Sequence, residues 1–181
     1  MEQAKPVFYY DLGSPQCYLV AETIMSTLPV VPEWEPVLGS KFAPEALDRA
    51  RIEGLAGRCE LQPLRWPAAW PADSAQAMLA ATYAKRIGRA VAFSLAAFRQ
   101  AFAGGRDLAD ESTILIAGAA CEMHPVALRK GIGLAGTATA LDAATERARA
   151  AGAERLPAIQ VGDRVYAGLD AIDYATKALA R

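Results

Sequence analysis

The 181-residue sequence holds little of the material from which disulfide frameworks and zinc sites are built. It has three cysteines, Cys17, Cys59 and Cys121, an odd number whose spacing fits no metal-ligand pattern. We therefore expect reduced thiols, no structural disulfide and no metal site. The single histidine, His124, stands before Pro125 without an accompanying Cys, Asp or Ser constellation, so we interpret it as a helix-entry residue and not a catalytic one.

An excess of charge of either sign is also missing, since 19 basic and 20 acidic residues leave a formal net charge of −1. This balance gives no electrostatic reason to expect nucleic acid or an anionic membrane as a partner. No apolar stretch is long enough to span a bilayer, and Met1 to Pro6 lacks the features of a signal peptide. We therefore expect a cytoplasmic protein, whose 53% hydrophobic residues are ample for a buried core.

What the sequence does have is a strand, turn and helix pattern at Val7 to Leu19, which reads VFYYDLGSPQCYL. The apolar run ends at Asp11-Leu12-Gly13 and passes into Ser14-Pro15, which predicts a buried strand that stops at a turn before a helix. Ser14 suits the N-cap, because its oxygen accepts from free N–H groups, and Pro15 suits the first helical position. The pattern places a hydroxyl at the positive end of a helix dipole, where an anion such as a thiolate is favoured.

The strands beyond this point predict an α/β protein. Val30 to Leu38 indicates a second strand, parallel to the first and at an edge of the sheet, because Pro32 and Pro36 interrupt it. Ala158 to Val161 and Arg164 to Tyr166 alternate on either side of a Gly-Asp pair, as the strands of a tight hairpin do.

Helical patterns dominate Ala43 to Gly136, a region rich in alanine. Pro44 predicts a first helix that ends at Ile52, and the glycines and prolines from Gly54 to Asp73 predict irregular chain. Trp66 and Trp70 fall in that irregular stretch, where large aromatics either fold back as a lid on the core, which we favour, or line a pocket. Further helices are expected from Ser74 to Gly88, Val91 to Phe102, Asp110 to Cys121, Pro125 to Gly131, Thr137 to Ala151 and Leu169 to Leu179.

Two separated motifs resemble one known group of proteins. Ser14-Pro15-Gln16-Cys17 stands where thioredoxin-fold proteins carry Cys-x-x-Cys, and with Tyr18-Leu19 it resembles the Ser-Pro-x-Ser-Tyr-Leu opening of 2-hydroxychromene-2-carboxylate isomerases and kappa-class glutathione transferases. Near the other end, Leu156-Pro157-Ala158-Ile159 and Tyr166-Ala167-Gly168-Leu169-Asp170 resemble the cis-proline strand and the Gly-x-Asp helix start of these families. Both families belong to the DsbA-like branch of the thioredoxin superfamily.

The resemblance implies an α/β fold that is thioredoxin-like (DsbA-like) with an all-helical insertion. It divides the chain into a thioredoxin-like domain, residues 1–42 and 137–181, and an inserted helical subdomain, residues 43–136. Dimers occur in these families, so a homodimer is a further expectation.

The same resemblance implies that Ser14 is catalytic. Its hydroxyl donates a hydrogen bond to the sulfur of glutathione, or of a related low-molecular-weight thiol, and favours thiolate over thiol. The backbone of Leu156, next to a cis Pro157, pairs with the cysteinyl part of glutathione. Asp170 holds the γ-glutamyl end, and Lys41 lies where the families place contacts to the glycyl end.

The motif around Cys17 distinguishes disulfide exchange from the other possible activities. Cys17 occupies the resolving position of the redox motif, but the attacking position is serine, so ordinary disulfide exchange is disfavoured. We interpret Cys17 as a buried packing thiol in place of the small residue of the isomerases, and we place it with Pro15 at the cofactor site. Leu169 and Ala171 depart from these families, which carry a polar residue and commonly an arginine at these positions.

The favoured function is a thiol-dependent isomerase or transferase that acts on a small aromatic or conjugated carbonyl compound. A disulfide oxidoreductase of the DsbA family is the first alternative, and a non-catalytic thioredoxin-fold binding protein is the second. Lys41 and Arg65 are two cations that could pair with a carboxylate of the thiol or of an acidic aromatic substrate, although solvated surface charge is the simpler interpretation of each.

Overall fold

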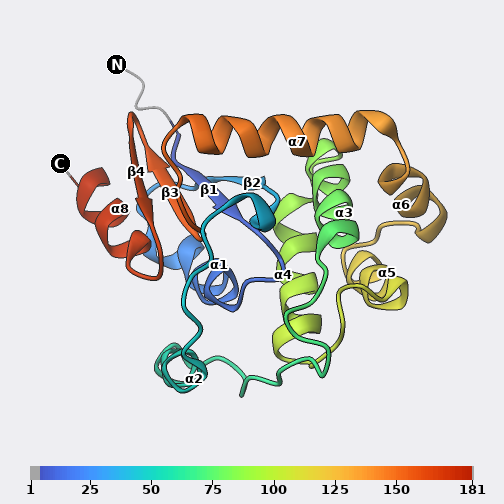
Figure 1. The fold of residues 1–181 in the computed structure, drawn as a ribbon, viewed down its shortest axis with the longest axis horizontal. Helices are drawn as coiled ribbons and strands as arrows, with labels where there is room; N and C mark the ends of the chain where they lie inside the picture. The colour runs from blue at the N-terminus through green and yellow to red at the C-terminus, as the bar shows by residue number, and fades with distance from the viewer. Residues whose placement is uncertain (1–4, 181) are drawn as a thin grey trace.

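A four-stranded mixed sheet with the order β2-β1-β3-β4 organises the computed structural model, which describes residues 5–180 (Figure 1). β1 (Val7–Tyr10) runs parallel to β2 (Glu33–Pro36) and antiparallel to β3 (Ala158–Val161), which forms a hairpin with β4 (Arg164–Ala167). The predicted first strand, parallel edge strand and hairpin are confirmed. β2 is shorter than expected, because proline lacks the N–H that a strand interior needs.

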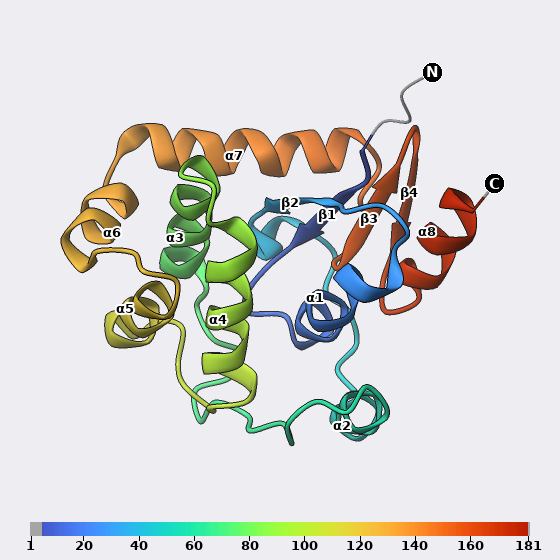
Figure 2. The ribbon, with the colours of Figure 1, turned by 180° about the vertical axis from the view of Figure 1, so that it is seen from behind.

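Helices surround this sheet on both faces and extend to one side of it (Figures 1 and 2). α8 packs against β3 and β4, α1 packs between α8 and α4, and α3 and α7 pack against β2. Both views show α7 running from the sheet to α6, while α2 lies on the opposite side of the molecule. The bounds are α1 (Pro15–Thr27), η1, a 3-10 turn (Gly39–Lys41), α2 (Arg49–Arg58), α3 (Ala75–Arg86), α4 (Ala90–Phe102), α5 (Glu111–Ala120), α6 (Pro125–Ile132), α7 (Ala135–Ala150) and α8 (Ala171–Leu179).

The structure corrects the first predicted helix of the middle region. The helix expected from Pro44 to Ile52 begins instead at Arg49, as α2, and ends at Arg58. Asp48 is the N-cap, and its carboxylate accepts from the Arg51 N–H at 3.0 Å, so the capping acid and not the proline sets the start. Irregular chain therefore begins after α2, later than predicted.

The core joins the sheet to the helices of the middle region. Phe8 and Tyr10 on β1 stack at 5.2 Å between ring centroids, and each meets the Trp34 ring of β2 edge-on. Tyr10 and Ser94 on α4 share a buried hydrogen bond of 2.6 Å, and Tyr10 also packs against Phe98. The division of the chain at residues 42 and 137 stays a prediction, but one apolar core runs across it.

Within residues 5–180, no helix is both long and apolar enough to cross a membrane. In the same residues, no cluster of three or more His, Cys, Asp or Glu side chains is placed to hold a metal ion. The cysteines are free, with Cys17 and Cys121 buried and Cys59 exposed.

Candidate functional site

The turn between β1 and α1 has the geometry that the sequence predicts. Ser14 is the N-cap of α1, its Oγ accepts a hydrogen bond from the Cys17 N–H at 3.1 Å, and Pro15 is the first helical residue. The hydroxyl also donates to Gln16 Oε1 at 3.3 Å, which is long for an O–H donor and therefore weak. Ser14 is half-buried, so its hydroxyl remains within reach of a ligand at the positive end of a 13-residue helix.

A buried carboxylate, Asp11, ties this turn to the loop after β2. Its two oxygens accept from the N–H groups of Gly13 and Gly39, both at 2.7 Å. Gly39 has no room for a side chain, because an added Cβ would lie 2.9 Å from Asp11 Oδ2. Burial raises the pKa of the Asp11 carboxyl, and the two amide hydrogen bonds oppose that rise. Asp11 thus holds the Ser14 turn against the neighbouring loop.

A cavity of about 410 Å³ opens in front of the Ser14 turn. Its walls come from the β1–α1 turn, the loop between β2 and α2, the segment that leads into α3, and Leu156 before β3. Phe42, Leu47 and Trp70 provide its largest apolar side chains. The volume and the mainly apolar walls suit a small aromatic molecule.

The cavity brings together some of the predicted site residues. Ser14, Pro15 and Leu156 all line it, although Leu156 lies more than a hundred residues from the Ser14 turn in the sequence. The predicted cis peptide between Leu156 and Pro157 is confirmed. The Pro157 carbonyl accepts from the Gly168 N–H at 2.8 Å, which ties this segment to the residues that precede α8.

Other predicted site residues lie outside the lining of the cavity. Lys41 is exposed at the end of η1, and Asp170 is exposed at the N-cap of α8, where its side chain makes no capping hydrogen bond. Their contacts to a thiol stay predictions. Arg65 is also exposed and outside the lining. His124 Nδ1 accepts from the Val126 N–H at 3.3 Å as the N-cap of α6, which confirms its interpretation as a helix-entry residue.

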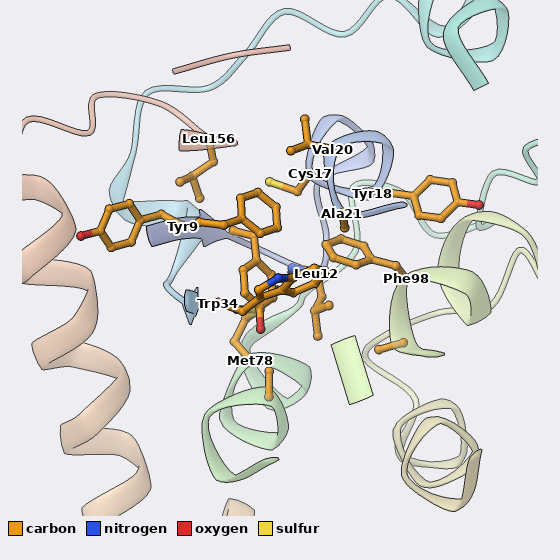
Figure 3. Packing of buried hydrophobic residues seen from close by; sticks show 14 of the residues in the cluster. Tyr9, Leu12, Cys17, Tyr18, Val20, Ala21, Trp34, Met78, Phe98 and Leu156 are labelled. Atoms are coloured by element: carbon orange, nitrogen blue, oxygen red, sulfur yellow. Dashed lines mark hydrogen bonds between the residues drawn. The ribbon is translucent and has the colours of Figure 1, made fainter. Parts of the chain in front are cut away.

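Cys17 lies behind the cavity and not in its lining. Figure 3 shows its sulfur directed from α1 toward Leu156, within the core. Burial raises the pKa of the Cys17 thiol to about 12, although its hydrogen bond with Ser14 opposes the rise. The thiol therefore keeps its proton at neutral pH and is a poor nucleophile. The prediction of a buried thiol is confirmed.

The two tryptophans of the irregular segment have different roles: one covers the core, and the other also lines the cavity. Trp66 packs edge-on against Phe102 at 6.3 Å and so covers the core, as favoured. Trp70 meets Trp66 at 5.6 Å but also lines the cavity, which the favoured interpretation missed. The Arg49 guanidinium lies 4.7 Å from the Trp66 ring centre and 5.7 Å from that of Trp70, and it holds the pair from outside.

Sequence reasoning also missed the acidic residues of the cavity lining, Asp11, Glu45 and Asp73. Asp11 had a usable signal, because an acid that ends a buried apolar strand must find hydrogen-bond donors when it is buried with it. Glu45, which lines the cavity, had none: it lies in an irregular segment that the sequence assigned to a helix.

The family model for the DSBA-like thioredoxin domain matches residues 7–180 of the chain. The match covers nearly the whole chain and includes both the Ser14 turn and the Leu156-Pro157 segment. A search of curated protein sequences found no significant relative.

Solved structures show the same fold at low sequence identity. A 2-hydroxychromene-2-carboxylate isomerase superposes with a TM-score of 0.85 at 17% identity, over 97% of this chain and 94% of the other. A probable DsbA oxidoreductase from Streptomyces coelicolor gives 0.78 at 16% identity, over 97% and 88%. The cytosolic disulfide reductase DsbM from Pseudomonas aeruginosa, solved with GSH, gives 0.64 at 18% identity, over 96% and 93%. At these identities the similarity establishes the architecture and leaves the reaction open.

Proposed function

This chain belongs to the DSBA-like thioredoxin family, and from its Ser14 turn we propose that it is a thiol-dependent isomerase or transferase. The observation that carries the proposal is a reachable serine hydroxyl at the N-terminus of α1, facing a cavity, in the position where a redox member of the family carries its attacking cysteine. A serine there cannot form a mixed disulfide. It can donate a hydrogen bond to a bound sulfur anion.

Known interactions are strong enough for Ser14 and the helix N-terminus to lower the pKa of a bound thiol. A free thiol has a pKa of about 8.5, and lowering it by two units requires about 2.7 kcal/mol of preferential stabilisation of the thiolate. A hydrogen bond to a charged acceptor contributes about 1.5–3 kcal/mol, and a helix N-terminus contributes about 0.3–1 kcal/mol. The sum of these two terms, about 1.8–4 kcal/mol, spans the required energy, and the acidic side chains of the cavity, Asp11 and Glu45, act against it.

Glutathione is the first thiol to test. A neighbour of the same fold was solved with GSH, which supports this choice. Ser14 and the backbone near Leu156 would hold its cysteinyl part, while Lys41 and Asp170 are the residues predicted to meet its two ends. A bound thiol supplies the nucleophilic sulfur, which adds to an electrophilic carbon as the thiolate.

In this reaction the protein orients the substrate and excludes water from the cavity. The apolar walls formed by Phe42, Leu47 and Trp70 hold an aromatic or conjugated carbonyl compound beside the Ser14 turn. In an isomerase, addition to the conjugated double bond leaves a single bond that rotates, and elimination restores both the double bond and the thiol. In a transferase, the adduct is released as the product.

Disulfide exchange remains the competing activity, because redox proteins share the fold. The buried, protonated Cys17 argues against it, since neither position of the motif presents a reactive thiolate. Ser14→Cys should introduce insulin-reducing activity that the native protein lacks. Reduction of insulin by the native protein would instead favour the redox assignment.

The direct test is calorimetric titration with glutathione of the native protein and of Ser14→Ala, followed by turnover assays with conjugated carbonyl compounds. We expect the substitution to weaken glutathione binding about tenfold, the equivalent of about 1.4 kcal/mol, and to abolish conjugation. Ser26→Ala, at an exposed position near the other end of α1, is the matched control. Equal binding and turnover in Ser14→Ala would exclude the proposed role of Ser14.

A further inference from the structure

The charges around the cavity are of one sign. Asp11, Glu45 and Asp73 line it, and none of its described lining residues is a lysine, an arginine or the histidine. With Asp11 buried and its pKa raised, Glu45 and Asp73 still leave two carboxylates on the walls. In a partly enclosed cavity, charges of the same sign as a ligand weaken its binding substantially.

The nearby cations that the structure describes do not reverse this charge. The Arg155 Nε lies 3.6 Å from Glu45 Oε2, so it offsets part of the charge of Glu45 and adds no further positive charge to the cavity. Arg49 lies over the rings of Trp66 and Trp70. Lys41 is exposed and lies outside the lining, so the cation predicted to receive a carboxylate does not stand on the cavity wall.

Two helix N-termini face the cavity, and both already have a partner or a proposed one. The residues at the start of α3 line it, and there the Asp73 carboxylate accepts from the Ala75 N–H at 2.9 Å. The N-terminus of α1 is the place of the sulfur in the proposed function. Neither leaves a free positive end for the carboxylate of a second molecule.

The cavity walls also contain two buried polar atoms that make no hydrogen bond within residues 5–180, although one of them, Glu45 Oε2, faces Arg155 at 3.6 Å. Glu45 Oε2 and Trp70 Nε1 are buried and have no hydrogen-bond partner among the described residues, and both side chains line the cavity. A buried donor or acceptor without a hydrogen-bond partner destabilises the folded protein, and a ligand group that supplies the partner removes that penalty. A ligand hydroxyl would offer both an acceptor for the indole N–H and a donor for the carboxylate, and a protonated amine would offer donors for the carboxylate, after a small shift of either side chain.

We infer that the electrophilic substrate of this site is an aromatic compound that is uncharged or carries an amine, and that aromatic carboxylates are rejected. The inference rests on the proposed function for the identity of the reaction, and on the charge and composition of the cavity walls for the choice of substrate. It separates this chain from any enzyme that binds an aromatic acid in the same place, because the walls here offer such an acid two carboxylates and no cation.

The test needs neither a thiol nor turnover, so its result is independent of the role of Ser14. Naphthylmethanol, naphthylmethylamine and naphthoate share one ring system and differ in charge. Each is titrated calorimetrically into the native protein, into Glu45→Gln, and into Asp142→Asn, which removes an exposed carboxylate of α7 outside the cavity.

We expect the native protein to bind naphthoate at least about tenfold more weakly than naphthylmethanol, and to bind the amine at least as tightly as the alcohol. Glu45→Gln should narrow the gap between amine and carboxylate several-fold, while Asp142→Asn leaves it unchanged. Naphthoate binding as tight as that of the alcohol overturns the inference, and so does a failure of both the alcohol and the amine to bind. In either case the Ser14→Ala comparison with glutathione still stands as a test of the proposed function.

Discussion

The N-termini of α1 and α8 have both been predicted to hold a thiol, yet they are built differently. At α1, the Ser14 side chain caps the helix and the residue lines a cavity, while Asp11 fixes the turn from behind. At α8, the N-cap Asp170 makes no side-chain capping bond, is exposed and lies outside the cavity lining. The difference shows that the N-terminus of α1 is fixed by capping and by a buried carboxylate, whereas the N-terminus of α8 is open to solvent and has no side-chain cap.

The largest change in stability should come from Asp11→Asn, which alters the residue that fixes the turn before α1. An amide presents an acceptor on one side and a donor on the other, so one of the two N–H groups at Gly13 and Gly39 would face another N–H. We expect a loss of about 1–3 kcal/mol in the free energy of unfolding, measured by urea denaturation. We also expect the affinity for glutathione to fall.

Asp142→Asn is the matched control for this substitution, because its carboxylate is exposed on α7. Unchanged stability in Asp11→Asn would mean that the carboxylate does not hold the turn. The contrast between the two helix ends would then lose its structural basis.

Substitution of the two caps compares the helix ends directly. Ser14→Ala should lower the free energy of unfolding by about 1 kcal/mol, the usual cost of removing a capping hydroxyl. Asp170→Ala should cost less than about 0.5 kcal/mol, because its side chain accepts no capping hydrogen bond. Equal losses, or a larger loss at Asp170, would contradict the difference between the two termini.

Binding of two different thiols tests whether Asp170, at the N-terminus of α8, contacts the ligand. If Asp170 meets the γ-glutamyl end, Asp170→Asn should weaken glutathione about threefold and leave mercaptoethanol, which lacks that end, unaffected. Titration of both thiols measures this effect. An equal loss for both would show that Asp170 acts on the fold and not on the ligand.

The smallest effect is expected at Cys17, which shares α1 with Ser14 but faces the core. Because burial raises the pKa of its thiol to about 12, Cys17 should resist iodoacetamide in the folded protein between about pH 7 and pH 9. Cys59 is exposed and should react. Mass spectrometry of the alkylated peptides identifies the modified residue, and rapid labelling of Cys17 would reopen the redox alternative.

Local signals in the sequence were enough to predict the sheet and the Ser14 turn. A capping serine followed by proline, and a glycine-centred hairpin, each act within a few residues, and the structure contains both. The predicted start of α2 at Pro44 was wrong. Both Pro44 and Asp48 are residues that favour a helix start, and the helix begins after the Asp48 cap. Here the choice depended on which first turn could satisfy its N–H groups.

The cavity was beyond the reach of the sequence for a different reason. Its walls combine Trp70, Glu45 and Leu156, which no spacing rule connects and which only the packed fold brings together. The charge of the cavity could not be anticipated either, since the chain as a whole is nearly neutral. From the resemblance, Ser14, Pro15 and Leu156 were predicted to share a site, and they line one cavity. Lys41 and Asp170 were predicted from the same resemblance, and they lie outside the lining of that cavity.

The most direct test of the central claim is the pKa of glutathione bound to the protein, followed by the ultraviolet absorbance of the thiolate across a pH titration. We expect a bound pKa well below the free value of about 8.5 in the native protein, and a return toward that value in Ser14→Ala. A bound pKa that equals the free value, or one that is lowered equally in both proteins, would contradict the claim that Ser14 at the N-terminus of α1 activates the thiol.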